Sequence, residues 1–229
     1  MTQFSDRSIR FAAVSLALLS LPSCASLSRQ EKGVVVGAGT GAAAGAAIGH
    51  ANGSTSRGAI LGAVVGGTIG GIIGHQMDQQ AKELAQNIPS ARVERVGEGI
   101  QVTFFSGLLF EFDSDRVLGE SARNLRTLAK SLDKYPGSNL VIVGHTDSLG
   151  KSTYNLNLSE RRARATAAYL TSQGILLERM KSEGRGETEP IADNSTEAGQ
   201  ARNRRVEVAI FASDAYSKEL AAKAARKKS

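Results

Sequence analysis

Glycine recurs at every fourth position through the first third of the chain, and this spacing restricts what that segment can fold into. One series runs from Gly33 to Gly49, a polar turn follows, and a second series runs from Gly58 to Gly74. A spacing of four places these glycines on one helical face, where another backbone can approach closely. We therefore predict a glycine-zipper helical hairpin over residues 33–76, with a flexible Gly/Ala linker as the alternative.

Such a hairpin is favoured in lipid or in an oligomer, because each glycine weakens an isolated helix in water by up to about 1 kcal/mol relative to alanine. Each run is about eighteen residues long, near the lower limit for crossing a bilayer. Alanine and glycine keep the mean apolarity of both runs modest. We expect a membrane-associated or self-associating hairpin, including a homo-oligomer formed through the zipper. Residues 77–91 are predicted to be a short helical linker.

The N-terminus has the pattern of an export signal, in which arginines precede an apolar stretch at residues 11–21. We place a signal peptide at residues 1–23. Cys24, the only cysteine of the chain, stands in a stretch that resembles a bacterial lipobox, so we predict that it is acylated and begins a lipidated linker over residues 24–32. The residue after Cys24 is Ala25 instead of an aspartate. By resemblance to bacterial lipoprotein sorting, this favours transport to the outer membrane over retention at the inner membrane. A conventional signal peptide with an incidental cysteine is the alternative.

Strands and helices interleave after residue 91. Alternating or continuous apolar runs predict strands at 92–96, 100–104, 108–112, 140–143, 180–183 and 205–210, and apolar residues at helical spacing predict helices at 121–134 and 159–173. This order implies an α/β sandwich, a mixed sheet with helices packed on one face, over residues 92–212. A basic tail follows at residues 213–229.

A polar turn between the strand at 140–143 and the next helix contains the residues most suggestive of a ligand site. Asp147 follows the strand end, and Arg162 falls in the first turn of a helix expected to begin near Ser159. We therefore expect an acid and a base to lie at the entrance of the same pocket. The helix N-terminus there would also favour an anion. The alternative is that Asp147 caps the turn and Arg162 forms a surface ion pair.

From residue 110 to residue 210 the chain resembles the OmpA-like peptidoglycan-binding domain family. The matching motifs are Phe110–Asp113, Gly144–Gly150, Asn155–Ala163, Tyr169–Leu170, Gly174–Ile175, Gly184–Glu187 with Pro190, and Asn203–Glu207. Gln200 departs from the family pattern, which often has arginine there. Together with the lipobox and the zipper, the chain most resembles the YiaD-type outer-membrane lipoproteins.

This resemblance implies non-catalytic binding of peptidoglycan through the diaminopimelate of its stem peptide. Asp147 would accept hydrogen bonds from the diaminopimelate ammonium, and Arg162 would hold its carboxylate. Asn155, Leu158 and Asp113 line the same pocket in relatives. The implied role is a tether between the outer membrane and the cell wall for envelope integrity, with lipid and peptidoglycan as partners and the C-terminal domain in the periplasm.

Other functions remain as alternatives. A structural assembly or pore built by the zipper would use wall binding only to position the oligomer. The net charge of +6 also suits nucleic acid, but the basic run Asn203–Arg205 abuts a predicted strand and the chain is exported, so we expect no nucleic acid. His145 has no second histidine beside it in the predicted domain, so we expect no metal, no cofactor and no enzyme. His145 is expected to pack or hydrogen-bond locally.

Overall fold

The computed structural model describes residues 38–65, 67–111 and 114–227. Within them a five-stranded sheet has the order β1-β2-β5-β3-β4. All neighbouring strands are antiparallel except β3 and β4, which are parallel. The strands are β1 (Arg92–Val96), β2 (Gly99–Phe105), β3 (Ser138–His145), β4 (Met180–Gly184) and β5 (Arg205–Ala212). The predicted hairpin between the first two strands is confirmed, with Gly97 in the left-handed region at φ 53°.

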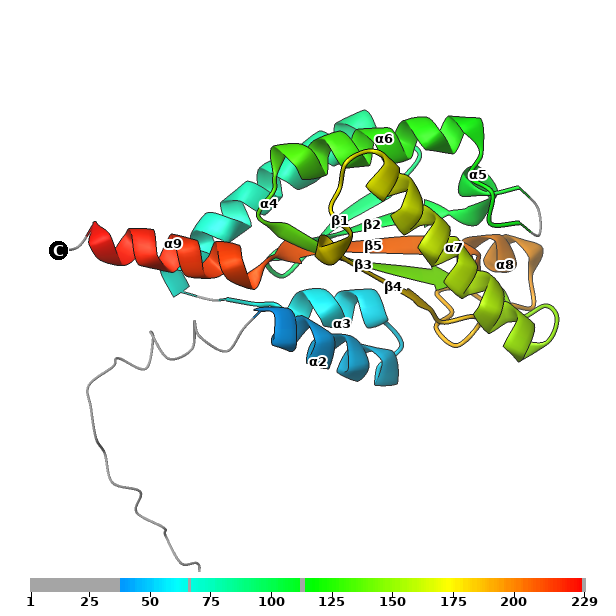
Figure 1. Cartoon of the computed structure of the whole chain (residues 1–229). Coiled ribbons are helices and arrows are strands. Elements are labelled where there is room, and N and C mark those ends of the chain that lie inside the picture. Colours follow the sequence, from blue (N-terminus) through cyan, green and yellow to red (C-terminus); the bar gives the residue numbers. More distant parts are fainter. Residues whose placement is uncertain (1–37, 66, 112–113, 228–229) are drawn as a thin grey trace, which may run out of the picture.

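The helices of the C-terminal part cover one face of this sheet, as predicted (Figure 1). Helix α6 follows its apolar spacing, because Leu125, Leu128 and Leu132 are all fully buried. The bounds are α4 (Gly67–Asn87), α5 (Ser106–Leu109), α6 (Gly119–Lys134), α7 (Ser152–Ser172), a 3-10 turn (Leu177–Arg179), α8 (Glu197–Asn203) and α9 (Asp214–Arg226).

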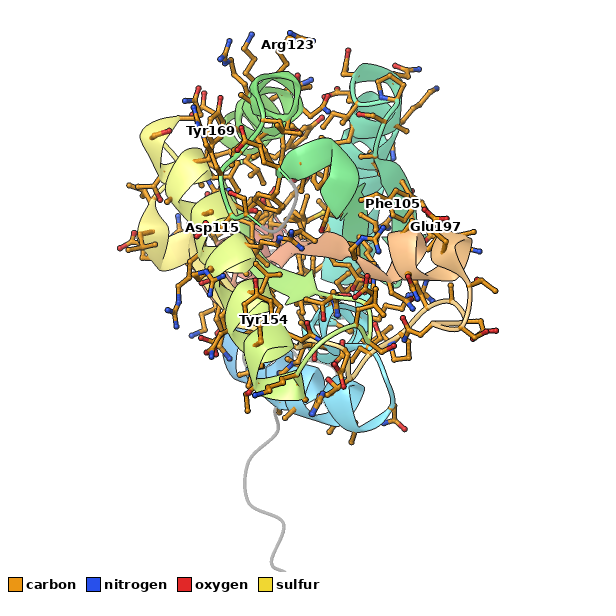
Figure 2. The ribbon with its side chains drawn as sticks, turned by 90° about the vertical axis from the view of Figure 1, so that its right-hand side faces the viewer. Phe105, Asp115, Arg123, Tyr154, Tyr169 and Glu197 are labelled. Atoms are coloured by element: carbon orange, nitrogen blue, oxygen red, sulfur yellow. The ribbon has the colours of Figure 1, made fainter. Side chains whose placement is uncertain are left out.

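A helical hairpin made of α2 (Ala38–Ala51) and α3 (Thr55–Gly62) covers the other face of the sheet. In Figures 1 and 2 this hairpin lies on the opposite side of the sheet from α6. Ala59 and Ile60 of α3 are buried in one cluster with Val141 and Val143 of β3. Because side chains alternate along a strand, these valines point away from the core that α4, α6 and α7 cover. The α2–α3 hairpin is therefore the third layer of the fold.

The glycines of the hairpin pack against one another within the chain. A Cβ on Gly45 would lie 2.7 Å from the Gly62 Cα and would also overlap the Gly58 carbonyl oxygen. A Cβ on Gly49 would lie 2.6 Å from the Gly58 Cα. The four-residue register thus lets the two helix backbones touch, as the small-xxx-small pattern predicts. Helices α2 and α3 therefore pack against each other within the chain through their glycines.

Two boundaries predicted for the N-terminal third are wrong. The second glycine series is not one helix, because α3 ends at Gly62 and α4 begins at Gly67. Residues 77–87 are helical as predicted, but they are not a separate linker: α4 runs across residue 76, and its Met77 and Leu84, with Ile88 just after the helix, are buried in the main core. Hydrophobic burial, rather than spacing, explains this helix. Among the described residues, no helix is both long enough and apolar enough to cross a bilayer.

One predicted strand differs from the structure. The described part of the predicted strand at 108–112, residues 108–111, does not form a core strand, because α5 ends at Leu109 and Phe110 makes only an isolated bridge to Val117. Such a short apolar run cannot distinguish a strand from a buried turn of helix. The basic tail forms the helix α9, whose Tyr216 and Leu220 pack against the core. The predicted signal peptide, Cys24 and the lipidated linker lie outside the described residues.

The zipper packing makes a direct prediction about stability. Gly45→Ala should lower the free energy of unfolding by about 1–3 kcal/mol, because the added methyl group meets the backbone of α3. Gly71→Ala is the matched control. A Cβ at Gly71 would be exposed with no atom within 4 Å, and the substitution removes a glycine from a helix interior. It should stabilise by about 0.5–1 kcal/mol. Chemical denaturation of both variants measures the difference, and equal effects would contradict the packing.

Candidate functional site

A pocket of about 390 Å³ lies beside the C-terminal end of β3. Its walls come from the α5 region, the loop after β3, the first half of α7 and the residue just before β5. Of the five predicted ligand residues, Asp147, Asn155, Leu158 and Arg162 line it. Asp113 lies outside the described residues. Figure 2 shows this side of the molecule, with Tyr154 of the pocket wall at the beginning of α7.

Asp147 is a nearly buried carboxylate with two partners in the protein. Its Oδ2 accepts a hydrogen bond from Nη1 of Arg204 at 2.5 Å, and its Oδ1 accepts one from the amide of Leu149 at 3.1 Å. The second contact is the turn-capping role considered as an alternative, so Asp147 does shape its own loop. A carboxylate offers about four acceptor positions, and two protein donors leave capacity for a ligand donor.

Arg162 is buried, at 4% exposure, and lies in the middle of its helix. Helix α7 begins at Ser152 instead of near Ser159, so the helix N-terminus does not reinforce anion binding at Arg162 as predicted. Nε donates to the Ser114 carbonyl at 2.9 Å, and the guanidinium carbon lies 5.3 Å from the centre of the Phe110 ring. A surface ion pair, the alternative considered for Arg162, is made instead by the neighbouring Arg161, whose Nε lies 3.8 Å from Oδ2 of Asp115.

Arg204 is the pocket residue that the sequence did not single out. It lies in the basic run before β5, and its guanidinium pairs with Asp147. Arg205, the next residue, points into the protein instead, where its Nε donates to Glu207 at 2.7 Å. Successive side chains of an extended chain point to opposite faces of the sheet, so the two arginines lie on opposite sides. The run Asn203–Arg205 is therefore structural, with one arginine at the pocket, and only the strand register could identify which one.

Asn155 links the pocket loop to the segment after β4. Its Nδ2 donates to the Asp147 carbonyl at 3.3 Å and to Oε2 of Glu187 at 2.5 Å. Gly144, at the end of β3, has no room for a side chain, because a Cβ there would overlap the Ser159 carbonyl oxygen of α7. Close packing of α7 on the strand end thus fixes the pocket wall.

His145 lies on the other side of the sheet, away from the pocket. It is fully buried, with its Nδ1 4.0 Å from Glu189 and its Nε2 3.7 Å from Glu207, and neither nitrogen has a hydrogen-bond partner. Burial lowers the pKa of His145, although the two carboxylates oppose that shift. Glu207 has a lowered pKa because its partners, His145 first among them, outweigh the effect of burial. His145 is thus a structural residue facing the α2–α3 hairpin.

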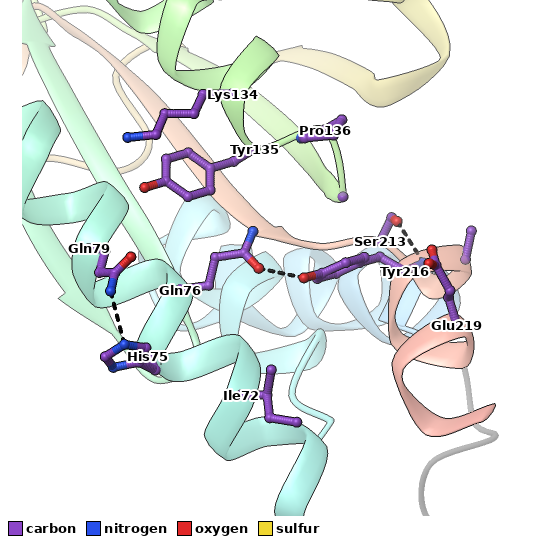
Figure 3. A pocket seen from close by; sticks show the side chains of 12 residues that line it. Ile72, His75, Gln76, Gln79, Lys134, Tyr135, Pro136, Ser213, Tyr216 and Glu219 are labelled. Atoms are coloured by element: carbon purple, nitrogen blue, oxygen red, sulfur yellow. Dashed lines mark hydrogen bonds between the residues drawn. The ribbon is translucent and has the colours of Figure 1, made fainter. Parts of the chain in front are cut away.

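A second cavity, of about 790 Å³, lies between α4, the end of α6 and α9 (Figure 3). Several of its polar groups pair with one another: the hydroxyl of Tyr216 donates to Gln76 at 2.5 Å, and Gln79 lies 2.9 Å from His75. It brings together no acid and base comparable to Asp147 and Arg162. Among the described residues, no cluster of three or more His, Cys, Asp or Glu side chains could hold a metal ion.

Comparison with known proteins agrees with this geometry. The OmpA family model matches residues 109–204, and a YMGG-like Gly-zipper model matches residues 6–78. The outer-membrane lipoprotein YfiB of Pseudomonas aeruginosa is 35% identical over 113 residues, covering 49% of this chain and 67% of YfiB. The chain belongs to the OmpA family.

Other members of the OmpA family match over different shares of their length. The probable lipoprotein YiaD of Escherichia coli is 34% identical over 136 residues, covering 58% of this chain and 62% of YiaD. The structure of the cell wall anchor of the T6SS from Pseudomonas aeruginosa has a TM-score of 0.53 and 34% identity, covering 58% of this chain and 96% of that one. Across four matched outer-membrane relatives, this OmpA family protein spans between 30% and 62% of their length.

The lowered pKa of His145 predicts how stability depends on pH. The unfolded chain takes up a proton near pH 6.5, whereas burial keeps His145 neutral in the folded state to lower pH. Stability is therefore full above about pH 6.5 and falls below it, by at most about 1.4 kcal/mol per pH unit. The losses from Glu189 and Glu207, whose pKa values are also lowered, begin only near the ordinary glutamate pKa of 4.5 and below.

Chemical denaturation at pH 7.5 and 5.5 measures this effect. His145→Gln should remove the fall in stability between these two pH values, and His75→Gln, on the exposed face of α4, should retain it. An unchanged pH dependence in His145→Gln would contradict the assignment.

Proposed function

We propose that the pocket binds the diaminopimelate residue of the peptidoglycan stem peptide. One end of this residue carries an ammonium and a carboxylate on the same carbon. The single observation that carries the proposal is the convergence of a carboxylate, Asp147, and a guanidinium, Arg162, both nearly buried, on one small pocket. Asp147 accepts from the ammonium and Arg162 donates to the carboxylate.

The pocket wall carries both signs of charge, and this favours a ligand that also carries both signs. An anion alone would leave its own charge beside Asp147, and a cation alone would lie beside Arg162 and Arg204. A zwitterion satisfies both halves of the pocket. Arg204 orients the Asp147 carboxylate before the ligand arrives. The apolar side chains of Leu158 and Phe110 provide a wall for the methylene chain between the two ends of diaminopimelate.

The same proposal gives the protein a non-catalytic role as a tether. The names of YfiB and YiaD describe lipoproteins, and the solved T6SS relative is described as a cell wall anchor. We infer that lipid at Cys24 holds this chain at the outer membrane while its C-terminal domain binds the wall in the periplasm, which supports envelope integrity. A pore or homo-oligomer is less well supported, because Gly41, Gly45 and Gly49 pack against glycines of the same chain.

Substitution of Arg162 tests the site with a matched neighbour as control. Arg162→Gln should lower the affinity for meso-diaminopimelate by about tenfold to a hundredfold, because it removes a charge-assisted hydrogen bond. Arg161→Gln, whose guanidinium is on the surface beside Asp115, should leave the affinity unchanged. Asp147→Asn should also bind weakly. Isothermal titration calorimetry measures all three, and similar affinities for Arg162→Gln and Arg161→Gln would reject the proposal.

The tether role has a separate test with purified sacculi. The protein should co-sediment with them, and Arg162→Gln should reduce that fraction. Because we propose binding alone, incubation should release no soluble muropeptides. Their release at a rate that depends on the protein would mean that it is a hydrolase.

A further inference from the structure

The segment Arg185–Glu189, between β4 and α8, contacts both the α2–α3 hairpin and the framework of the ligand pocket. Its two ends face the hairpin, and its middle faces α7 and the loop after β3. The segment is joined to both features by hydrogen bonds.

On the hairpin side, Glu189 is 1% exposed and holds the beginning of α3. Its carboxylate accepts from the Thr55 amide at 3.1 Å and from the Thr55 hydroxyl at 2.6 Å, and His50 Nδ1 lies 2.9 Å away. Arg185 Nε donates to the same Thr55 hydroxyl at 2.8 Å. A carboxylate at the first residue of a helix is stabilised by the helix dipole and the free amides there. Thr55 is thus held from both ends of the segment.

On the pocket side, the middle of the segment supports the residues that carry Asp147 and Asn155. The Gly186 carbonyl accepts from the Thr146 amide at 2.9 Å, next to Asp147 in the chain. The Gly186 amide donates to the Ser159 hydroxyl of α7 at 2.9 Å. Glu187 accepts from the Asn155 amide group, which also donates to the Asp147 carbonyl. A shift of this segment would therefore move the backbone that positions the Asp147 carboxylate.

We propose that docking of the α2–α3 hairpin tightens the ligand site through this segment, with Thr55 and Glu189 as positioning residues. This inference rests on the proposed function. When the hairpin is docked, Glu189 and Arg185 are fixed, so Gly186 and Glu187 hold the pocket loop in its binding geometry. When the hairpin is released, the segment loses these contacts and ligand binding must order it again. By linkage, ligand must in turn strengthen hairpin docking by the same factor.

The reciprocal effect is tested on the full-length protein in detergent micelles. Hydrogen exchange of the backbone amides of α2 and α3 is measured by mass spectrometry with and without saturating meso-diaminopimelate. We expect ligand to slow this exchange severalfold, although no atom of the hairpin lines the pocket. A hairpin that only covers the sheet would exchange at the same rate in both samples, and that result would overturn the inference.

Variants of Thr55 test the forward effect. Thr55→Val removes the hydroxyl with little change of shape, and the affinity for meso-diaminopimelate should fall by about threefold to tenfold. Thr55→Ser keeps the hydroxyl and should restore the affinity. Thr127→Val makes the same change on α6, where the hydroxyl donates to the Arg123 carbonyl, and should have no effect on affinity.

The outcomes separate the two proposals. A wild-type protein that fails to bind meso-diaminopimelate contradicts the proposed function. If the wild-type protein binds it, then either equal binding by Thr55→Val or hairpin exchange that is independent of ligand contradicts only the coupling. If Thr55→Val does not fold, Glu189→Gln replaces it, because this change keeps the shape of the side chain and weakens its bonds to Thr55.

Discussion

The antiparallel register between β3 and β5 is the constraint on which both polar regions of the molecule depend. His145 pairs with Arg205 at the end of this ladder. Asp147 comes two residues after His145 on the chain leaving β3, and Arg204 comes one residue before Arg205 on the chain entering β5, so the register brings the two residues of the pocket ion pair to the same edge of the sheet. A slip of one residue would exchange the faces of every side chain in β5. The pocket and the buried cluster on the other face would then both be lost.

The glycine-zipper hairpin α2–α3 covers the second face of the sheet. Its backbones pack closely enough for a short hairpin to cover Val141 and Val143, and the beginning of α3 binds Glu189 through Thr55. A hairpin with larger residues at the glycine positions would keep the same polar contacts but could not bring its two helices together. Small residues and carboxylates therefore act together in one interface, which joins the N-terminal third to the domain that carries the pocket.

The sequence predicted the parts of the fold that periodicity determines and missed those that depend on tertiary contacts. The spacing of Leu125, Leu128 and Leu132 predicted α6, and the motif Gly144–Gly150 correctly placed Asp147 just after the end of a strand. The start of α7 was missed because its first two turns are mostly polar and exposed. The third layer left a signal in the continuous apolar run Leu140–Val143, since a strand buried on both faces lacks polar alternation. Arg204 could not be identified without the register.

Recognition of a zwitterion is the central claim, and the ligand can be varied while the protein is unchanged. Two muropeptides that differ only in their third residue, meso-diaminopimelate or lysine, both present an ammonium, but only the first adds a carboxylate on the same carbon. Isothermal titration of the full-length protein with both compares them directly. The account predicts that the diaminopimelate muropeptide binds at least about tenfold more tightly, because only this muropeptide offers a carboxylate to the Arg162 guanidinium. Equal affinity for the two muropeptides would contradict it.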